Sequence, residues 1–197
     1  MPIEGRQRPT KTIVAALIVG GLVVSGLLLT SLLDPGAGGP GGAGSATIVS
    51  AEPFDPRGDQ SERADIAPRA IDGDPETMWR TDTYDRAGLA GLKPGVGLIL
   101  TLDRSTALDE IQFLTASSGW RAEIYVGDDF GPNDSSFSTE PLGDPVAVVD
   151  DGGTSETASL GGATGSKVLV WITETGTTLD INDREVHRFV LFEVTAS

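Results

Sequence analysis

The 197-residue chain has no cysteine and a single histidine, His187. The absence of cysteine excludes disulfide bonds, thiol catalysis, cysteine-based zinc sites and lipid attachment through a cysteine. Any folded domain must therefore be stable without disulfide cross-links. Residues 46–197 are numerous enough to bury a sufficient core without such cross-links.

Recognisable catalytic patterns are also missing. Catalysis needs a nucleophile beside a base, or an acid and a base within reach of one another. The sequence has no G-x-S-x-G elbow, and no spacing of its carboxylates marks a pair with divergent pKa values. We therefore expect a non-catalytic module and assign no catalytic residue.

Basic residues are scarce, and their distribution is uneven. The formal net charge is −15, with 11 basic and 27 acidic side chains in residues 46–197. The first eleven residues instead carry Arg6, Arg8 and Lys11 against Glu4. An acidic surface repels phosphate backbones and anionic lipid headgroups, so we expect no nucleic-acid partner and no direct lipid docking by residues 46–197.

Only one long apolar run is present, the uncharged segment Thr12–Leu33. About 20 such residues span a bilayer as a helix. Basic residues precede this segment and Asp34 follows it, which places the N-terminus in the cytoplasm and the rest outside. A cleaved signal peptide is the alternative, but its apolar region is usually only about 7 to 15 residues long. We predict a single-pass cell-membrane anchor.

The predicted organisation has four parts. Residues 1–11 form a cytoplasmic tail, 12–33 the membrane helix, 34–45 a linker and 46–197 an extracytoplasmic domain. The linker contains six glycines and two prolines without a large side chain, which is typical of a flexible tether.

Short β-branched and aromatic runs, separated by Gly, Pro, Asp and Asn, follow the linker. We predict strands at Thr47–Ala51, Val96–Leu102, Leu108–Ala116, Ala122–Val126, Val146–Val149, Thr157–Leu160, Lys167–Thr173 and Arg188–Thr195. Only Glu62–Ala70 is compatible with a short helical turn. This pattern predicts an all-β fold, an antiparallel β-sandwich or jelly roll.

The most informative loop is A-I-D-G-D-P-E-T-M-W-R-T at Ala70–Thr81. Asp72, Asp74 and Thr77 place three side-chain oxygens close together in the sequence. Ca²⁺ binds about six to eight oxygen ligands, including backbone carbonyls, so such a loop is a candidate calcium site. The alternative is an ordinary Asp-Gly turn with solvated carboxylates.

This loop belongs to a wider resemblance. Together with V-G-L-I-L-T-L-D, W-R-A-E-I-Y-V-G-D and R-F-V-L-F-E-V-T, it resembles the discoidin or coagulation-factor type C superfamily, also called galactose-binding-like domains. The resemblance covers nearly all of residues 46–197. It implies a galactose-binding-like jelly roll that binds carbohydrate.

A narrower resemblance concerns three short runs, F-D-P-R-G-D, W-R-T-D-T-Y and L-K-P-G-V-G. They are similar to the extracytoplasmic C-terminal domain of actinobacterial MviN/MurJ-type lipid II flippase polypeptides. The flippase bundle and kinase-like domain that precede this module in those polypeptides are absent here, so we expect no flippase activity. A separate flippase or another cell-wall synthesis protein is a candidate partner.

The superfamily resemblance also implies a ligand set for a structural calcium ion. It consists of the Asp72 and Glu193 carboxylates, the Thr77 oxygens and the backbone carbonyls of Arg69, Asp74 and Phe192. Such an ion would join an early loop to the last strand and stabilise the folded state.

For ligand binding, planar donors and aromatic faces in polar loops are the best candidates. These are Arg80, Tyr84, Arg86 and Trp120, whereas Trp79 and Trp171 are expected in the core. Two functions remain open. One is binding of cell-wall glycan or another peptidoglycan-related carbohydrate, and the other is a scaffold for an envelope protein.

Overall fold

The computed structural model describes residues 46–197. The predicted cytoplasmic tail, membrane helix and linker lie outside the described residues. Within the described range, no helix is long and apolar enough to cross a membrane. The range folds as an antiparallel β-sandwich, which confirms the predicted fold class.

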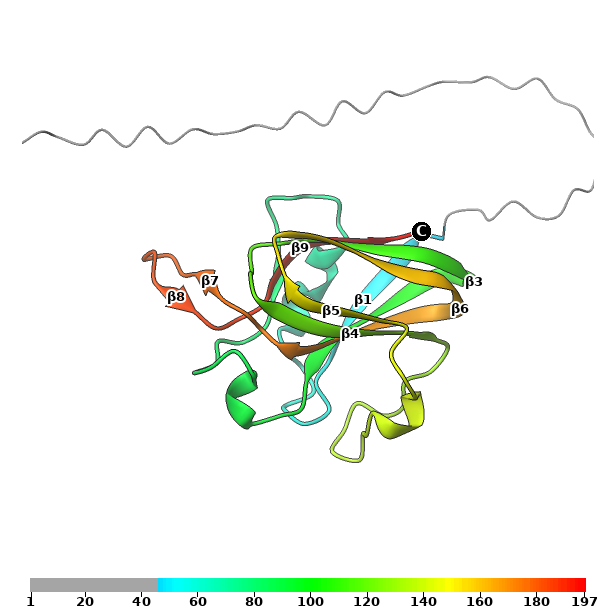
Figure 1. Cartoon of the computed structure of the whole chain (residues 1–197), viewed down its shortest axis with the longest axis horizontal. Coiled ribbons are helices and arrows are strands. Elements are labelled where there is room, and N and C mark those ends of the chain that lie inside the picture. The colour runs from blue at the N-terminus through cyan, green and yellow to red at the C-terminus, as the bar shows by residue number, and fades with distance from the viewer. Residues whose placement is uncertain (1–45) are drawn as a thin grey trace, which may run out of the picture. The chain divides into compact units, whose positions relative to one another are not determined.

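Nine strands and three short 3₁₀ helices make up this domain (Figure 1). In chain order they are β1 (Ile48–Phe54), η1 (Ala64–Ala70), β2 (Trp79–Arg80), η2 (Leu89–Gly91), β3 (Val96–Thr115), β4 (Trp120–Gly127), η3 (Glu140–Leu142), β5 (Ala147–Gly152), β6 (Ser155–Glu174), β7 (Thr178–Leu179), β8 (Glu185–Val186) and β9 (Val190–Ala196).

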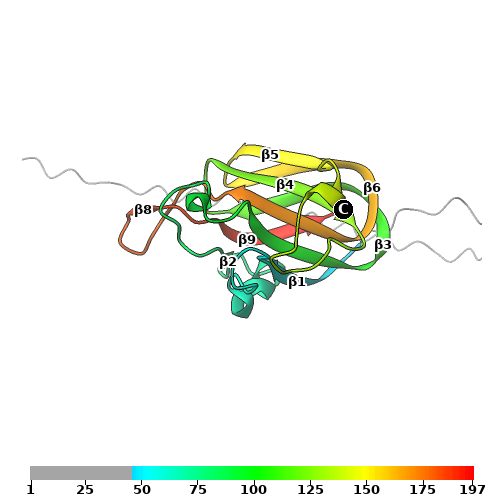
Figure 2. The ribbon, with the colours of Figure 1, turned by 90° about the horizontal axis from the view of Figure 1, so that it is seen from below.

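The two long strands, β3 and β6, belong to both layers of the sandwich. In one layer the first half of β3 pairs with β1 and with the second half of β6, which in turn pairs with β4. In the other layer the second half of β3 pairs with β9 and with the first half of β6. Figure 2 shows η1 beside β1 and β2, and β7 and β8 form a separate hairpin.

Strand number is the main correction to the sequence prediction. Val96–Leu102 and Leu108–Ala116 were predicted as separate strands, as were Thr157–Leu160 and Lys167–Thr173. Each pair instead lies along one twenty-residue strand. The intervening polar and glycine residues bend the chain, with register shifts between Thr101 and Thr106, but do not end the strand. The predicted turn in Glu62–Ala70 is present as η1.

The main core lies between the layers and contains the buried indoles of Trp79 and Trp120. A second aromatic cluster lies on the opposite side of β4 and β6. It contains Phe54, Tyr125, Phe130, Phe137, Leu169 and Trp171. The loop that joins β4 to β5 therefore covers one layer from outside, which brings it next to the end of β1.

Candidate functional site

The D-G-D loop has the local geometry of a compact acidic turn. The Asp74 amide donates to Asp72 Oδ1 at 3.0 Å, and Thr77 Oγ1 donates to Asp72 Oδ2 at 2.8 Å. These bonds lower the pKa of Asp72. The Asp74 carboxylate instead accepts the Glu76 amide at 2.9 Å, so it closes its own turn.

The last strand reaches this loop, as the resemblance implies. Glu193 Oε2 accepts the Gly73 amide at 3.0 Å, and the pairing register between β3 and β9 skips Phe192 beside it. Burial raises the pKa of Glu193, and the nearby Asp72 carboxylate adds to the rise. Arg69, at the end of η1, contributes a positive charge near Asp72. Two carboxylates and one hydroxyl therefore lie together at this end of the sandwich.

This oxygen set fits a hard cation in kind, since Ca²⁺ accepts carboxylate, hydroxyl and backbone carbonyl ligands. Within residues 46–197, no three Asp, Glu or His side chains converge in a way that could hold a metal. Any ion at the loop would thus depend on backbone carbonyls and water for the rest of its coordination.

The predicted carbohydrate-binding residues are not brought together. Trp120 is fully buried and its indole Nε1 donates to the Gly153 carbonyl at 2.9 Å, so its ring presents no face to a ligand. Tyr84 is also buried, with its hydroxyl on Glu62 at 3.0 Å. Arg80 lies on β2 and is partly exposed, and Arg86 lies in the loop before η2. Only the two arginines remain accessible to a ligand.

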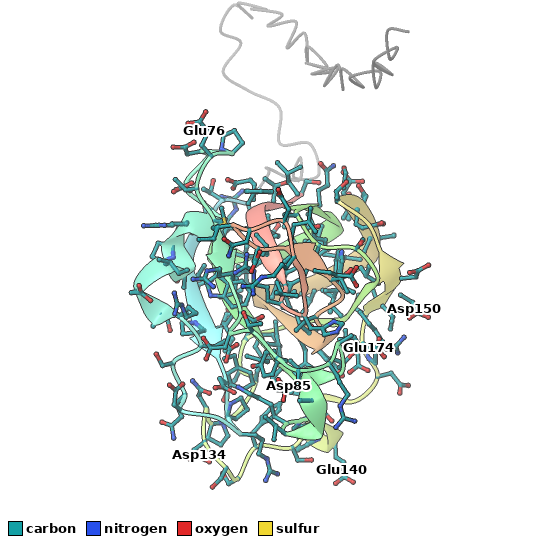
Figure 3. The ribbon with its side chains drawn as sticks, turned by 90° about the vertical axis from the view of Figure 1, so that its left-hand side faces the viewer. Glu76, Asp85, Asp134, Glu140, Asp150 and Glu174 are labelled. Carbon is teal, nitrogen blue, oxygen red and sulfur yellow. The ribbon has the colours of Figure 1, made fainter. Side chains whose placement is uncertain are left out.

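An open groove of about 670 Å³ lies instead where three loops meet at one end of the sandwich. Its lining comes from the loop after β1, the loop before β3 and the loop between β4 and β5. The lining residues are Pro56, Arg57, Gly58, Gln60, Leu92, Pro94, Asp134 and Ser135. Figure 3 places Asp134 at the opposite end from Glu76 of the D-G-D loop.

Hydrogen bonds hold the groove's loops together. Asn133 accepts the Asp55 amide at 2.9 Å and donates to the Gln60 carbonyl at 3.2 Å. Arg57 donates to the Phe137 carbonyl at 3.1 Å, which fixes its guanidinium along one wall. These bonds join segments about eighty positions apart in the sequence. The loops that form the groove are therefore held in place by bonds within the protein.

A buried ionic cluster supports the groove wall that the loop before β3 forms. We call it the Lys93 cluster. Lys93 Nζ donates to Asp55 Oδ1 at 2.8 Å and to Glu62 Oε2 at 3.0 Å, and both carboxylates are 1% exposed. Glu62 Oε1 also accepts the Tyr84 hydroxyl and the Asp82 amide. Every charge in this cluster has a partner.

The pKa values in the Lys93 cluster follow from burial and pairing. Burial raises the pKa of Asp55, although the hydrogen bond from Lys93 opposes the rise. Burial also raises the pKa of the Tyr84 phenol, and the Glu62 carboxylate adds to this. For Lys93, burial disfavours the ammonium, but the hydrogen bonds that it donates to Asp55 and Glu62 outweigh this effect and raise the pKa of Lys93. The cluster thus keeps one cation between two acidic side chains.

Two nearby carboxylates can act as acid and base only where a substrate reaches them. Asp55 and Glu62 are buried and do not line the groove. The groove itself offers a guanidinium, an amide, a carboxylate and a hydroxyl beside the apolar Leu92 and two prolines. Such a mixture can bind the hydroxyls and the apolar faces of a saccharide.

Sequence reasoning missed this groove, although a signal was present. Two of the runs that carry the narrower resemblance, F-D-P-R-G-D and L-K-P-G-V-G, supply much of its lining. Gly58 shows why one of these runs is constrained, since a Cβ there would overlap the Asp55 carboxylate. The long sequence separation of the three loops hid their proximity.

Comparison with known proteins assigns the fold. No family model matches the sequence. Chitosan-binding module 1 of a chitosanase/glucanase from Paenibacillus sp. IK-5 aligns at 19% identity and TM-score 0.50, over 77% of this chain and 96% of that chain. Module 2 of the same enzyme, in complex with chitotriose, aligns at 14% identity and TM-score 0.49, over 77% and 97%.

A third solved structure is CpGH89CBM32-5 from Clostridium perfringens, in complex with GalNAc-β-1,3-galactose. It aligns at 17% identity and TM-score 0.47, over 77% of this chain and 99% of that chain. Identities this low speak for the fold and not for a shared ligand. Residues 46–197 thus share the antiparallel β-sandwich fold of the chitosan-binding module.

Proposed function

We propose that the chain is a non-catalytic carbohydrate-binding module whose ligand is cell-wall glycan or another peptidoglycan-related carbohydrate. The observation that carries the proposal is the groove lined by Arg57, Gln60, Leu92 and Asp134. Its polar groups suit sugar hydroxyls, and the exposed Leu92 suits an apolar ring face. The fold supports the proposal, because carbohydrate-binding modules such as the chitosan-binding one share it.

The proposed setting is the outer side of a bacterial cell membrane. The apolar segment Thr12–Leu33 would anchor the chain with its N-terminus in the cytoplasm, and the linker would hold the module away from the bilayer. A lipid II flippase or another cell-wall synthesis protein is the proposed neighbour. Fractionation of cells tests the anchor, and a shortened product in the soluble fraction would contradict it.

We also propose that a calcium ion stabilises the D-G-D loop. Asp72, Thr77 and Glu193 would supply side-chain oxygens, and the carbonyls of Arg69, Asp74 and Phe192 would complete the set. A bound ion would relieve the repulsion between the two carboxylates and tie the loop to β9. Millimolar calcium should then raise the melting temperature of chelator-treated protein. An unchanged melting temperature would contradict the proposed calcium site.

The test of the main proposal is retention of the full-length protein on insoluble peptidoglycan at moderate salt. The double substitution Arg57→Ala with Gln60→Ala should abolish saturable retention, because it removes two polar groups from the groove. The matched control is Arg121→Ala with Gln112→Ala, since neither residue lines the groove. Equal retention of both double variants would contradict binding in the groove.

The second candidate function is a scaffold that docks an envelope protein. The exposed apolar side chains of the β7–β8 hairpin favour it, with Leu179 at 59% and Ile181 at 97% exposure. Co-purification of one membrane protein, lost on Ile181→Ser and accompanied by no glycan retention, would select the scaffold. A cleaved glycan product in the retention assay would instead point to an enzyme.

A further inference from the structure

Three arginines lie near one another at the β2–β9 pair. Trp79 and its partner Leu191 belong to the main core, whereas Val190, the partner of Arg80, does not, so the pair Arg80–Val190 faces the other side of the strands. Val190 is 2% exposed, so this side is also largely covered. Arg188 lies two residues before Val190, just outside β9, and its charge acts on Arg80. Arg63 immediately precedes η1, and its guanidinium lies 4.0 Å from Asp82, two residues after Arg80. We call Arg63, Arg80 and Arg188 the arginine cluster.

The guanidinium groups of this cluster have few acceptors within residues 46–197. Arg80 forms no hydrogen bond or ion pair within residues 46–197. Arg188 donates one bond, from Nη2 to the Leu179 carbonyl at 3.3 Å, and Arg63 has only the 4.0 Å contact with Asp82. The Nε atoms of Arg63 and Arg188 are buried without any partner. Each guanidinium carries about five N–H donors, so most of them are unused.

Such a gathering is costly to the folded protein. Burial and the charges of Arg63 and Arg188 lower the pKa of Arg80, while Asp82 and Asp65 oppose this only in part. A buried donor without an acceptor also costs free energy, and such groups often mark the place of an ion. In a chain of net charge −15, three adjacent cations that are offset only in part by Asp82 and Asp65 need a further explanation.

We propose that the arginine cluster binds a single oxyanion, a phosphate or carboxylate group carried on an otherwise neutral molecule. Guanidinium groups bind both kinds of oxyanion through paired N–H bonds. The surrounding acidic surface repels extended polyanions and anionic membranes, which favours an isolated charge. The site is separate from the groove, because none of its residues lines that groove.

The acidic surface also gives the site selectivity. Three guanidinium groups add little binding free energy for a neutral sugar. A sugar that bears one carboxylate or phosphate forms charge-assisted hydrogen bonds with them and binds more tightly. If the groove binds carbohydrate as proposed, the arginine cluster would add preference for ligands with one anionic substituent. The cluster would bind an oxyanion even if the groove bound nothing.

The test is calorimetric titration of the full-length protein in a non-ionic detergent at low ionic strength. The probes are inorganic phosphate, glycerol phosphate and galacturonate, which separate a free anion, a lipid-type phosphate and a sugar carboxylate. We expect saturable binding of at least one probe. Arg80→Gln and Arg188→Gln should each weaken it by about tenfold or more, and added salt should weaken it further.

Arg121→Gln is the matched control, since it removes the same charge from an arginine that pairs with Asp150 at 3.1 Å. Its affinity for the probes should equal that of the unmodified chain. Arg80→Lys keeps the charge without the planar fork and should give an intermediate affinity, and melting curves confirm that each variant is folded. The proposal is overturned if no probe binds, or if Arg121→Gln weakens binding as much as Arg80→Gln. Peptidoglycan retention by Arg80→Gln reports separately on the groove.

Discussion

The Lys93 cluster and the arginine cluster are two concentrations of charge in the same domain, and they are built in opposite ways. Lys93 lies between two buried carboxylates, each within 3.0 Å of its ammonium. The arginine cluster places three cations together with only a 4.0 Å contact to a carboxylate that is 62% exposed. In the Lys93 cluster each charged group pairs with another group of the protein. In the arginine cluster N–H donors remain for a ligand.

This difference separates structural charges from charges that can serve a ligand. Asp55 and Glu62 lie under the groove and join the loops that form it, so their role is to position the walls. Arg80 forms no hydrogen bond or ion pair in the described domain and is partly exposed. Removing a charge should therefore be destabilising in one cluster and nearly neutral in the other.

The largest effect is expected from Lys93→Met, which leaves two buried carboxylates without their cation. Breaking a buried ion pair from one side costs about 3–5 kcal/mol of the free energy of unfolding. Denaturant titration measures this loss in the free energy of unfolding. Lys167→Met is the control, because Lys167 is only partly buried and forms no salt bridge in the described domain, and its cost should stay within about 0.5 kcal/mol. Equal costs would remove the distinction between the clusters.

A smaller loss is expected from Asn133→Ala, which removes the bonds between the groove's loops. The Asp55 amide and the Gln60 carbonyl would lose their partner, at a cost of about 1–3 kcal/mol. The same substitution at Asn182 is the control, since only its backbone amide is bonded there. A loss at Asn182 as large as at Asn133 would show that the loops are not held in this way.

The pH dependence of the two tyrosines tests burial at two places, since Tyr84 lies at the Lys93 cluster and Tyr125 in the second aromatic cluster. Burial raises the pKa of Tyr84 and of Tyr125 above the ordinary value of 10.0, with Glu62 and Glu123 adding to the two rises. Because the folded pKa is raised, the unfolded chain ionises first. The stabilisation is complete below pH 10 and is lost as the pH rises above it. Absorbance of tyrosinate should stay flat through pH 10, and a normal titration there would contradict the buried cluster.

The smallest change in stability is expected from Arg80→Gln. It removes a cation that repels two others and breaks no hydrogen bond, so the free energy of unfolding should rise slightly or stay within about 0.5 kcal/mol. Denaturant titration beside Lys93→Met gives the contrast directly. A loss of several kcal/mol would mean that Arg80 is structural.

Much of the fold could be predicted from the sequence because strand signals are local. The β-branched runs of β3, β6 and β9 and the turn before β2 appear as short patterns, and the buried Trp79 and Trp171 follow from them. The pairing of Asp72 with Thr77, five residues away, is also local. The approach of Glu193 to this loop was implied by the family resemblance alone.

The candidate site was harder to predict, because it depends on contacts between distant segments. Trp120 stands beside a glycine turn and looks like an exposed platform, but packing against Phe189 and Phe113 makes it part of the core. Tyr84 is covered in the same way by the Lys93 cluster. The groove and the arginine cluster each combine residues from separate loops, which no local pattern brings together.

The central claim is that a saccharide binds in the groove. Its most direct test is a titration of the isotope-labelled full-length protein with a soluble peptidoglycan fragment, followed by nuclear magnetic resonance. The amide signals of Arg57, Gly58, Gln60 and Leu92 should shift and saturate together, whereas those of the D-G-D loop at the other end should stay in place. No shift, or saturating shifts confined to residues outside the groove, would contradict the account.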